Sequence, residues 1–571
     1  MAGGDILFTG LSCIVFMALV GFASWYRTRG TASTGEGYFL AGRGLTATFI
    51  AGSLLLTNLS AEQLIGLNGS AYGYDMSSMA WEVTAAVATI AMALVFLPRY
   101  LAGAFTTLPQ FLADRFDESV RRMSVVLFML GYGLVTIPSV LYSGSVAVMA
   151  LFDVPGLTGL AYVPALVATI VAIGVTGAIY AVFGGLKAVA VSDTINGVGL
   201  LIVGILIPVL GLIALGDGEF TRGLSRLLAG HPEKLNAIGD AQSPTPFGTI
   251  FTGMIFANLF YWCTNQYVIQ RTLGARSLAE GQKGVLASGF FKIMVPFMMM
   301  IPGVIAFHLY GPGFATIDQA YPRLVADLLP VALSGFFLAV LLGAVFSSFN
   351  SLLNSAATLF AIDVYAPARN DAVDDAELVR VAKFASVVIA LFSFAIAPLL
   401  HFAQEGLWQV IRVFTGFYNI PTIAIVIVGL FTRRVPALGA KIAIVFHVVV
   451  YALLRFVLDD VVTLHFIHQY ALLFLAEVAI MLAAGYWRPR ETPWSFTPRH
   501  EIDLEEWRYA KPLAGTLFSC VVALYLLFSP LALAGESGFS DLFGLSMAGL
   551  VMANVAIWLA ARRRGMPAPV S

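Results

Sequence analysis

Four charged side chains lie inside long apolar stretches of the sequence: Glu82, Asp193, Lys292 and Arg412. A charge in a dry apolar environment is costly, so such residues are usually paired or bind an ion or a polar solute. Lys292 follows ASGFF and precedes IMVPFMMM, which leaves its ammonium group no short route to water. We expect Glu82 and Lys292 to pair around a bound polar solute; the alternative is a purely structural buried pair. Asp193 lies near the start of its apolar stretch, where it could instead be interfacial.

Polar residues also interrupt the apolar stretch LLLTNLSAEQLIG, residues 54–66. Its SAEQ segment fits a capping box with Ser60 at the N-cap and Gln63 three residues later. This pattern predicts that one helix ends near Thr57 and that another begins at Ser60. The main-chain groups freed by such a break can bind ions and polar solutes. The alternative is a kinked structural helix whose polar groups are satisfied by neighbouring helices.

A second interruption, NLFYWCTNQ at residues 258–266, concentrates amides, aromatic rings and a hydroxyl group in another apolar stretch. It lies five apolar stretches after the first interruption. Two interrupted spans in corresponding places predict two repeats of five helices, with a binding site where the repeats meet. The alternative is that these polar groups only join helices through hydrogen bonds.

A stripe of hydroxyl and amide side chains follows in SSFNSLLNSAAT. Steps of three and four residues place its members on one helical face; they are Ser347, Ser351, Asn354, Ser355 and Thr358. Neutral hydroxyl and carbonyl oxygens suit a small hard cation such as Na⁺. Polar stripes of this kind also occur between tightly packed membrane helices, so a packing role is the alternative.

The composition indicates the environment of these stretches. Of 571 residues, 59% are hydrophobic and 11% are charged, whereas about 25% are charged in ordinary globular proteins. The chain is therefore predicted to be an all-α polytopic membrane protein. A net charge of -1 provides no basic field for nucleic acid, and the three cysteines suggest no disulfide framework. The N-terminal sequence lacks the features of a cleaved signal peptide, so we expect the first apolar segment to be retained.

The sequence contains no P-loop, HExxH or GxSxG motif, so we do not expect an enzyme. Without a nucleotide site, transport would have to draw on an ion gradient. One charge moving down roughly 100 mV releases about 2.3 kcal/mol.

A membrane-spanning helix needs about 20 mainly apolar residues. On this basis we predict about fifteen spans, at residues 5–26, 45–67, 77–98, 121–147, 161–183, 188–214, 247–269, 286–309, 327–364, 381–402, 405–431, 437–458, 464–487, 512–533 and 540–561.

The charges between the spans favour one orientation, because loops on the inner side of a membrane are rich in lysine and arginine. With the N-terminus outside and the C-terminus in the cytoplasm, the outer loops hold only Arg222, Arg226, Lys234 and Arg323. The inner segments hold many more basic residues, including Arg562–Arg564 at the end of the chain. We therefore expect a multi-pass protein of the cell inner (plasma) membrane in this orientation.

Four longer motifs, TNLSAEQLIG, FGGLKAV, FYWCTNQYVIQRTL and SSFNSLLNSAATLF, occur in an order that resembles the solute:sodium symporter family. Within it, they are similar to the sodium/glucose (galactose) cotransporter branch, from about Gly37 to Arg434. The resemblance implies a LeuT-like fold, a 5+5 inverted repeat with extra flanking helices. It implies an N-terminal flanking segment 1–44, a first repeat 45–214, an extracytoplasmic loop 215–246, a second repeat 247–431 and C-terminal flanking helices 432–571.

The resemblance also implies roles at a solute site. The residues that would hydrogen-bond sugar hydroxyl groups are Asn58, Ser60, Gln63, Glu82, Asn258 and Lys292. Tyr261 matches an aromatic residue that stacks on the pyranose ring as an inner gate. Arg412 departs from the pattern, because a glutamine stands there in the galactose symporter, and a cation could favour an anionic or more oxidised sugar. Ala85 likewise replaces a serine beside Glu82.

A sodium site is implied between the first interruption and the serine stripe. Its ligands would be the carbonyl groups of Leu56, Leu59 and Ala344 and the hydroxyl groups of Ser347 and Ser348. Asp193 matches an acidic residue on the exit path of the ion. Asn350 and Ser351 stand where some relatives bind a second ion.

We therefore expect a secondary active transporter that couples Na⁺ to uptake of a monosaccharide, a hexose such as galactose or glucose, by alternating access. The expected partners are the sugar, the sodium ion and the lipid bilayer, and no nucleic acid; the oligomeric state is left open. The alternative solutes are a polyol, a sugar acid, an amino acid or a vitamin. A channel or a membrane sensor would be a different class of protein, since a channel needs no solute site and a sensor would normally carry a soluble signalling domain.

Overall fold

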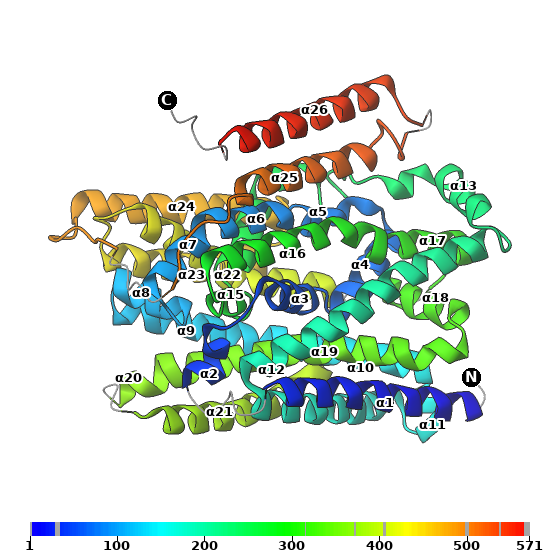
Figure 1. The fold of residues 1–571 in the computed structure, drawn as a ribbon, viewed down its shortest axis with the longest axis horizontal. Coiled ribbons are helices and arrows are strands. Elements are labelled where there is room, and N and C mark those ends of the chain that lie inside the picture. Colours follow the sequence, from blue (N-terminus) through cyan, green and yellow to red (C-terminus); the bar gives the residue numbers. More distant parts are fainter. Residues whose placement is uncertain are drawn as a thin grey trace, which may run out of the picture.

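The computed structural model describes residues 3–28, 35–314, 316–369, 373–402, 407–496, 502–535 and 538–564. Within these residues the structure is helical, and its extended pairing is limited to two isolated bridges, Leu45–Ala275 and Ser277–Asp503. The chain begins at one end of the bundle with α1 (Gly3–Thr28), and the last described helix, α26 (Asp541–Arg564), ends at the other (Figure 1). Fifteen predicted membrane crossings, an odd number, would likewise leave the two ends of the chain on opposite sides of the membrane.

The first part of the chain forms α2 (Gly35–Leu40), α3 (Ala47–Asn58), α4 (Ala61–Gly73), α5 (Met79–Val83), α6 (Ala85–Ala91), α7 (Leu97–Gly103), α8 (Leu108–Arg115), α9 (Glu118–Gly131), α10 (Ile137–Phe152), α11 (Val154–Thr158) and α12 (Tyr162–Leu215). The middle part forms α13 (Phe220–Gly230), α14 (Gly253–Cys263), α15 (Gln266–Leu273), α16 (Leu278–Met299), α17 (Ile301–Tyr310), α18 (Ala320–Leu328), α19 (Val331–Thr358), α20 (Ala366–Ala368), α21 (Asp375–Ile396) and α22 (Leu407–Phe431). The remaining helices are α23 (Ala437–Phe456), α24 (Phe466–Trp487), α25 (Ala510–Leu527) and α26.

Short 3₁₀ or π segments join or extend several of these helices. They are η2 (Ala41–Arg43), η3 (Met76–Ser78), η4 (Met92–Phe96), η5 (Tyr132–Thr136), η6 (Pro232–Leu235), η7 (Phe247–Phe251), η8 (Ile317–Gln319), η9 (Leu359–Tyr365) and η10 (Ala397–Phe402).

The prediction of about fifteen spans agrees with the helices. Among the described residues, 13 helices are long and apolar enough to cross a membrane, and the bent pair α3 and α4 brings the number to 14. The predicted span 247–269 is broken, because α14 ends at Cys263 and α15 begins at Gln266. The break falls inside the polar NLFYWCTNQ stretch, where the sequence predicted an interruption.

The predicted spans 161–183 and 188–214 correspond to two of these candidate spans, Tyr162–Ile179 and Val189–Leu215. Both lie within the 54-residue helical run of α12. The loop 215–246 contains α13, whose Gly223 and Leu227 are buried, because its leucines recur at helical spacing.

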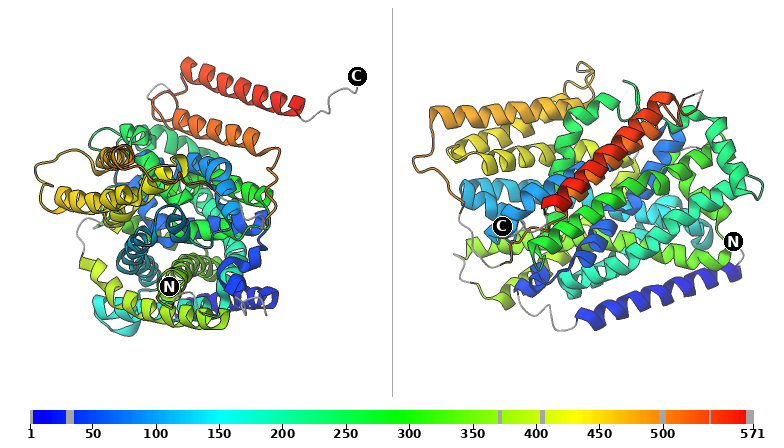
Figure 2. Two further views of the ribbon diagram at one scale, coloured as in Figure 1. Left: turned by 90° about the vertical axis from the view of Figure 1, so that its left-hand side faces the viewer. Right: turned by 45° about the horizontal axis from the view of Figure 1, so that its top comes forward.

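The two interrupted helices lie in the middle of the bundle. α3 packs against α12, α16 and α19, and α14 packs against α6, α22 and α24. α1 and α26 lie on the outside of the bundle, and α26 packs mainly against α25 (Figures 1 and 2). The broken segments are therefore shielded on several sides by intact helices, the setting in which an interrupted helix is tolerated at membrane depth.

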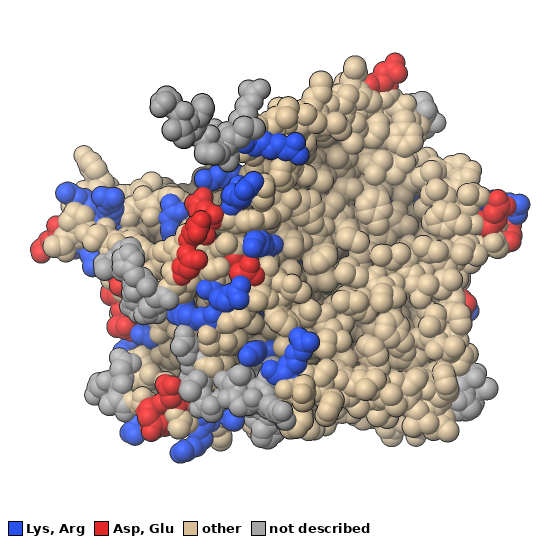
Figure 3. All heavy atoms as spheres, viewed as in Figure 1, with Lys and Arg blue, Asp and Glu red and all other residues tan. Residues whose placement is uncertain are grey.

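Charged side chains are unevenly distributed on the surface. In the face shown in Figure 3, lysine and arginine gather towards the end of the bundle that holds α2 and α20, and uncharged residues cover most of the rest. A broad uncharged surface is what a protein needs where it faces lipid tails.

Candidate functional site

The first helix break lies where the sequence predicted it. α3 ends at Asn58, α4 begins at Ala61, and the two helices are bent by 56° with respect to each other. Ser60 is the N-cap residue of α4, as expected, but its side chain makes no capping hydrogen bond. The predicted capping box is wrong, because the Gln63 amide instead donates to Glu82 Oε1 at 3.1 Å. A buried carboxylate is a strong acceptor, and it draws this side chain away from the helix end.

The second break, at Thr264 and Asn265 between α14 and α15, is held by two tyrosines that were not expected at the site, Tyr132 and Tyr267. The Tyr132 hydroxyl group donates to Asn265 Oδ1 at 2.5 Å and accepts the N–H of Tyr267 at 3.3 Å. The Tyr267 hydroxyl group donates to the Tyr261 hydroxyl oxygen at 2.7 Å. Tyrosines are common in membrane helices, so their number in the sequence gave no signal of this role.

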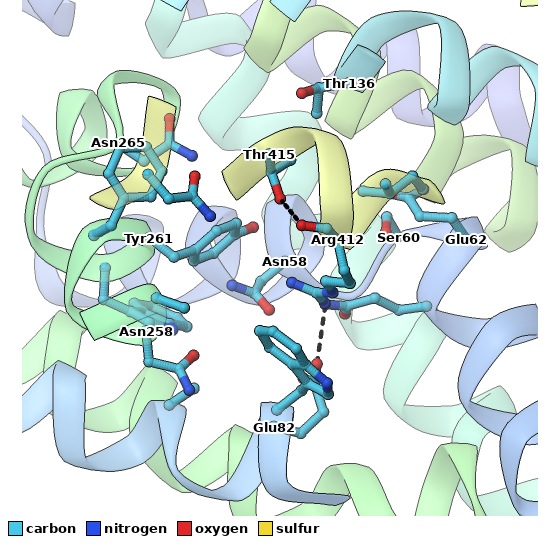
Figure 4. A pocket seen from close by; sticks show the side chains of 18 of the residues that line it. Asn58, Ser60, Glu62, Glu82, Thr136, Asn258, Tyr261, Asn265, Arg412 and Thr415 are labelled. Atoms are coloured by element: carbon cyan, nitrogen blue, oxygen red, sulfur yellow. Dashed lines mark hydrogen bonds between the residues drawn. The ribbon is translucent and has the colours of Figure 1, made fainter. Parts of the chain in front are cut away.

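Both breaks contribute to one internal pocket. All eight residues expected at the solute site line it: Asn58, Ser60, Gln63, Glu82, Asn258, Tyr261, Lys292 and Arg412. They come from α3, α4, α5, α14, α16 and α22. Figure 4 shows the side chains of Asn58, Tyr261 and Arg412 pointing into the same space. Segments more than 350 positions apart in the sequence therefore meet at this pocket.

The pocket contains a buried ion pair. Lys292 Nζ contacts Glu82 Oε2, and the two residues are 3% and 1% exposed. The other Glu82 oxygen accepts from Gln63, so both oxygens of the carboxylate are engaged. The Lys292 ammonium group also lies 5.9 Å from the centre of the Trp262 ring. The predicted pairing of Glu82 with Lys292 is thus present, and it places two opposite charges in the wall of the pocket.

A second cation reaches the pocket from α22. The Arg412 guanidinium group lies 4.3 Å from the centre of the Trp81 ring, a cation–π distance. Trp81 precedes Glu82 on α5 and lines the same pocket. Arg412 therefore points into the cavity and not towards lipid. Trp81 was not expected at the site, although its position next to the Glu82 carboxylate indicates it.

Several amide oxygens in the pocket wall have no hydrogen-bond partner within the described part of the chain. They are Asn58 Oδ1, Gln63 Oε1 and Asn419 Oδ1, all buried. The Asn258 amide behaves differently, since its Nδ2 donates to Thr84 Oγ1 at 2.8 Å. A buried acceptor without a partner costs free energy. These amide oxygens can therefore accept hydrogen bonds from a solute that carries several hydroxyl groups.

The residues expected to bind sodium lie where α3 ends against α19. Leu56, Leu59, Ala344, Ser347 and Ser348 are all buried, and α3 packs on α19. The hydroxyl oxygen of Ser348 has no hydrogen-bond partner among the described residues. Thr57 Oγ1 lies 3.5 Å from Ser351 Oγ across the same boundary. Two buried hydroxyl groups beside a helix end fit a small cation that prefers oxygen ligands.

Asp193 is not interfacial. It is 1% exposed, accepts from Ser53 Oγ at 2.7 Å and lies 3.7 Å from the Arg271 guanidinium group. Arg271 also donates to Ser53 at 2.7 Å and contacts Ser351. Arg271 was not expected in the interior, because the predicted span 247–269 ends before it. In the structure, the break between α14 and α15 turns this arginine inward.

The two residues considered for a second ion have different surroundings. Asn350 lines a small cavity with Ser192, Asn196 and Ser347, and its Oδ1 has no hydrogen-bond partner in the described structure. Ser351 contacts Arg271.

This chain resembles known proteins in sequence and in fold. The family model described as "Sodium:solute symporter family" matches residues 38–446. The chain is 44% identical over 513 residues to "Uncharacterized symporter YidK" of Escherichia coli strain K12, covering 90% of this chain and 89% of the relative. It is 31% identical over 452 residues to a sodium/glucose cotransporter of Vibrio parahaemolyticus, covering 75% and 81%. A mouse sodium/myo-inositol cotransporter is 30% identical over 481 residues, covering 77% and 65%.

The solved structure of a Na⁺-coupled sialic acid symporter in a substrate-bound outward-open state has a similar fold. The TM-score is 0.73 at 20% sequence identity, covering 85% of this chain and 99% of the other. This likeness confirms the expected LeuT-like fold. The family match confirms the resemblance drawn from the four motifs.

Proposed function

Because the chain belongs to the sodium:solute symporter family, in which Na⁺ is the coupling ion, we propose that it imports a monosaccharide with sodium. The proposed solute is a hexose such as galactose or glucose, carried by alternating access. The observation that carries the proposal is the set of buried amide oxygens without partners in the pocket wall, at Asn58, Gln63 and Asn419. A sugar presents hydroxyl donors on all sides and can satisfy several of them at once.

The remaining groups of the pocket fit the same solute. A pyranose ring has a flat apolar face, which the Tyr261 ring can cover. The Lys292–Glu82 pair can donate to and accept from hydroxyl groups, since an ammonium group donates and a carboxylate accepts. Ser60 and Asn258 supply further polar groups in the pocket wall. We assign all of them, with Arg412, to solute binding.

The sodium site is proposed at Leu56, Leu59, Ala344, Ser347 and Ser348. Its position at the end of α3 supports a simple form of coupling. Asn58, which lines the solute pocket, lies between the two proposed α3 ligands Leu56 and Leu59. An ion bound there would fix the end of α3, and with it the Asn58 side chain, before the sugar enters. Ion and solute would then favour the same conformation, which is what coupling requires.

A cyclic polyol is the second candidate solute. It carries the same hydroxyl donors, and the mouse relative named as a sodium/myo-inositol cotransporter supports its inclusion. A sugar acid is the third candidate solute, because the Arg412 guanidinium group can pair with its carboxylate.

We also propose an orientation with the N-terminus outside and the C-terminus in the cytoplasm of the cell. The basic residues between the spans support it. We propose segments 45–214 and 247–431 as the two inverted repeats, because the breaks at Leu59–Ser60 and Thr264–Asn265 occupy corresponding places in them.

The test is uptake into proteoliposomes that contain the purified protein. The radiolabelled solutes are D-galactose, D-glucose, myo-inositol, D-galacturonate and L-proline, each with an inward Na⁺ or an inward K⁺ gradient. We expect saturable uptake of a hexose with Na⁺ only. Uptake of L-proline alone, or hexose uptake that is equal in both gradients, would contradict the proposal. Uptake of myo-inositol without hexose would select the second candidate.

A further inference from the structure

The helix that carries Arg412 is held from behind by three side chains that do not line the pocket. Tyr470 of α24 donates its hydroxyl hydrogen to the Arg412 carbonyl oxygen at 2.7 Å. Tyr451 of α23 donates to the carbonyl oxygen of Val413 at 2.9 Å. His447 of α23 lies with Nε2 3.0 Å from the carbonyl oxygen of Gly416. Three carbonyl groups within five residues of α22 thus receive hydrogen bonds from two neighbouring helices.

His447 is itself fixed by Glu477 of α24. Its Nδ1 lies 2.5 Å from Glu477 Oε1, and both residues are 0% exposed. A main-chain carbonyl group can only accept, so Nε2 must carry the hydrogen that faces Gly416. Two bare acceptors would repel each other at 2.5 Å, so a proton lies between Nδ1 and the carboxyl oxygen. With this shared proton and the hydrogen on Nε2, the pair is neutral overall.

Close packing brings these groups against α22. A Cβ atom added to Gly416 would lie 2.5 Å from the Tyr470 hydroxyl oxygen and 2.7 Å from that of Tyr451. Only glycine allows this approach. Pro421 lies one turn further along α22 and lacks an N–H, so this part of the helix has fewer hydrogen bonds of its own. Hydrogen bonds from the side chains of α23 and α24 therefore contribute more to the geometry of this part of α22.

We propose that Tyr470, Tyr451 and the His447–Glu477 pair are positioning residues for solute binding. They fix the main chain of α22 so that the Arg412 guanidinium group stays over Trp81 in the pocket. None of the four lines the pocket, so they act only through α22. This inference rests on the proposed solute site, since it assigns a role to residues outside that site.

Two variants remove the hydrogen bonds without leaving a buried charge. Tyr470→Phe deletes the donor to the Arg412 carbonyl. The double variant His447→Phe/Glu477→Leu replaces the pair by apolar groups of similar size, a change that buried pairs often tolerate. A conservative variant, Glu477→Gln, keeps the arrangement, because its amide can donate to Nδ1 while Nε2–H still reaches Gly416. Tyr525→Phe is the matched control, since the buried Tyr525 hydroxyl group has no partner in the described residues.

The first readout needs no solute. Hydrogen–deuterium exchange of the peptide covering residues 411–420 should be faster in Tyr470→Phe and in the double variant, and unchanged in Glu477→Gln and Tyr525→Phe. The second readout is Na⁺-driven uptake of the solute that passes the panel test. We expect KM for that solute to rise about threefold in Tyr470→Phe and in the double variant. This is the typical effect of one hydrogen bond inside a membrane protein. The Na⁺ concentration for half-maximal uptake should not change.

Unchanged hydrogen–deuterium exchange in both Tyr470→Phe and the double variant would overturn the inference. A rise in the sodium requirement equal to the rise in KM would also overturn it, because it would indicate general loosening of the fold. Failure of Glu477→Gln to behave like the wild type would contradict the assigned proton arrangement. If the wild-type protein carries none of the solutes in the panel, the proposed function fails, and the exchange measurement still decides whether these residues hold α22.

Discussion

Lys292 and Glu82 are 210 positions apart in the sequence and form a buried ion pair in the wall of the pocket. One comes from α16 and the other from α5, so the contact ties two helices together next to the proposed solute site. The pair also explains how the interior can hold both charges. Each is neutralised by the other, and Gln63 satisfies the second carboxylate oxygen.

Breaking this pair on one side should destabilise the protein strongly. Lys292→Met leaves an uncompensated buried carboxylate, which we expect to cost about 3–5 kcal/mol. The double variant Lys292→Met/Glu82→Gln removes both charges and should recover much of that loss. Thermal unfolding in detergent, followed by tryptophan fluorescence, measures the difference. Equal melting temperatures for the wild type and Lys292→Met would show that the pair does not bear on stability.

Gln63→Ala should weaken solute binding while leaving sodium binding intact. The substitution removes the unpartnered Oε1 acceptor, and a single neutral hydrogen bond is worth about 0.5–1.5 kcal/mol. KM for the transported solute should therefore rise by a factor between about two and about twelve, with no change in the sodium concentration for half-maximal uptake. Asn554→Ala is a suitable control, because Asn554 lies on α26 and donates only to its own helix. An unchanged KM in Gln63→Ala would remove Gln63 from the site.

Ser348→Ala should raise the sodium concentration needed for half-maximal uptake. The hydroxyl group of Ser348 is buried without a partner, so its removal costs no existing hydrogen bond and should not harm folding. We expect a severalfold increase, with maximal uptake at saturating Na⁺ close to that of the wild type. Ser393→Ala on α21 provides a comparison, since that buried serine already bonds to its own helix. If the two variants have the same sodium dependence, the ion binds elsewhere.

The sequence predicted the site better than it predicted the local geometry. Polar residues stand out in apolar helices, which is why the breaks at Ser60 and near Asn265 and the charges of Glu82 and Lys292 could be identified. Side-chain partners depend on which helices become neighbours, and no local pattern contains that information. Gln63 therefore bonds to Glu82 and not to the helix end, and Arg271 reaches Asp193 from a helix 78 positions away.

The residues that hold α22 could not be predicted for the same physical reason. Arg412 was identified as a departure from a family pattern, but the residues behind it were not. His447 and Glu477 occur in ordinary apolar helices 30 positions apart, and only their packing shows that they form a hydrogen bond. Tyr451 and Tyr470 are likewise unremarkable in sequence.

Arg412→Gln should change which solute is preferred. The guanidinium group lies in the pocket against Trp81, in a dry environment where a charge-assisted hydrogen bond contributes about 1.5–3 kcal/mol. A negatively charged sugar that pairs with it should lose at least about tenfold in affinity in this variant, whereas a neutral sugar should change by less than about threefold. Competition of unlabelled D-galacturonate and D-galactose against the transported solute measures both affinities in the same vesicles. Arg412→Lys separates charge from shape, because it keeps the charge and loses the planar group that stacks on Trp81. If the ratio of the two affinities is the same in the wild type and in Arg412→Gln, the guanidinium group does not select the solute, and its contact with Trp81 serves only to hold α22 against α5.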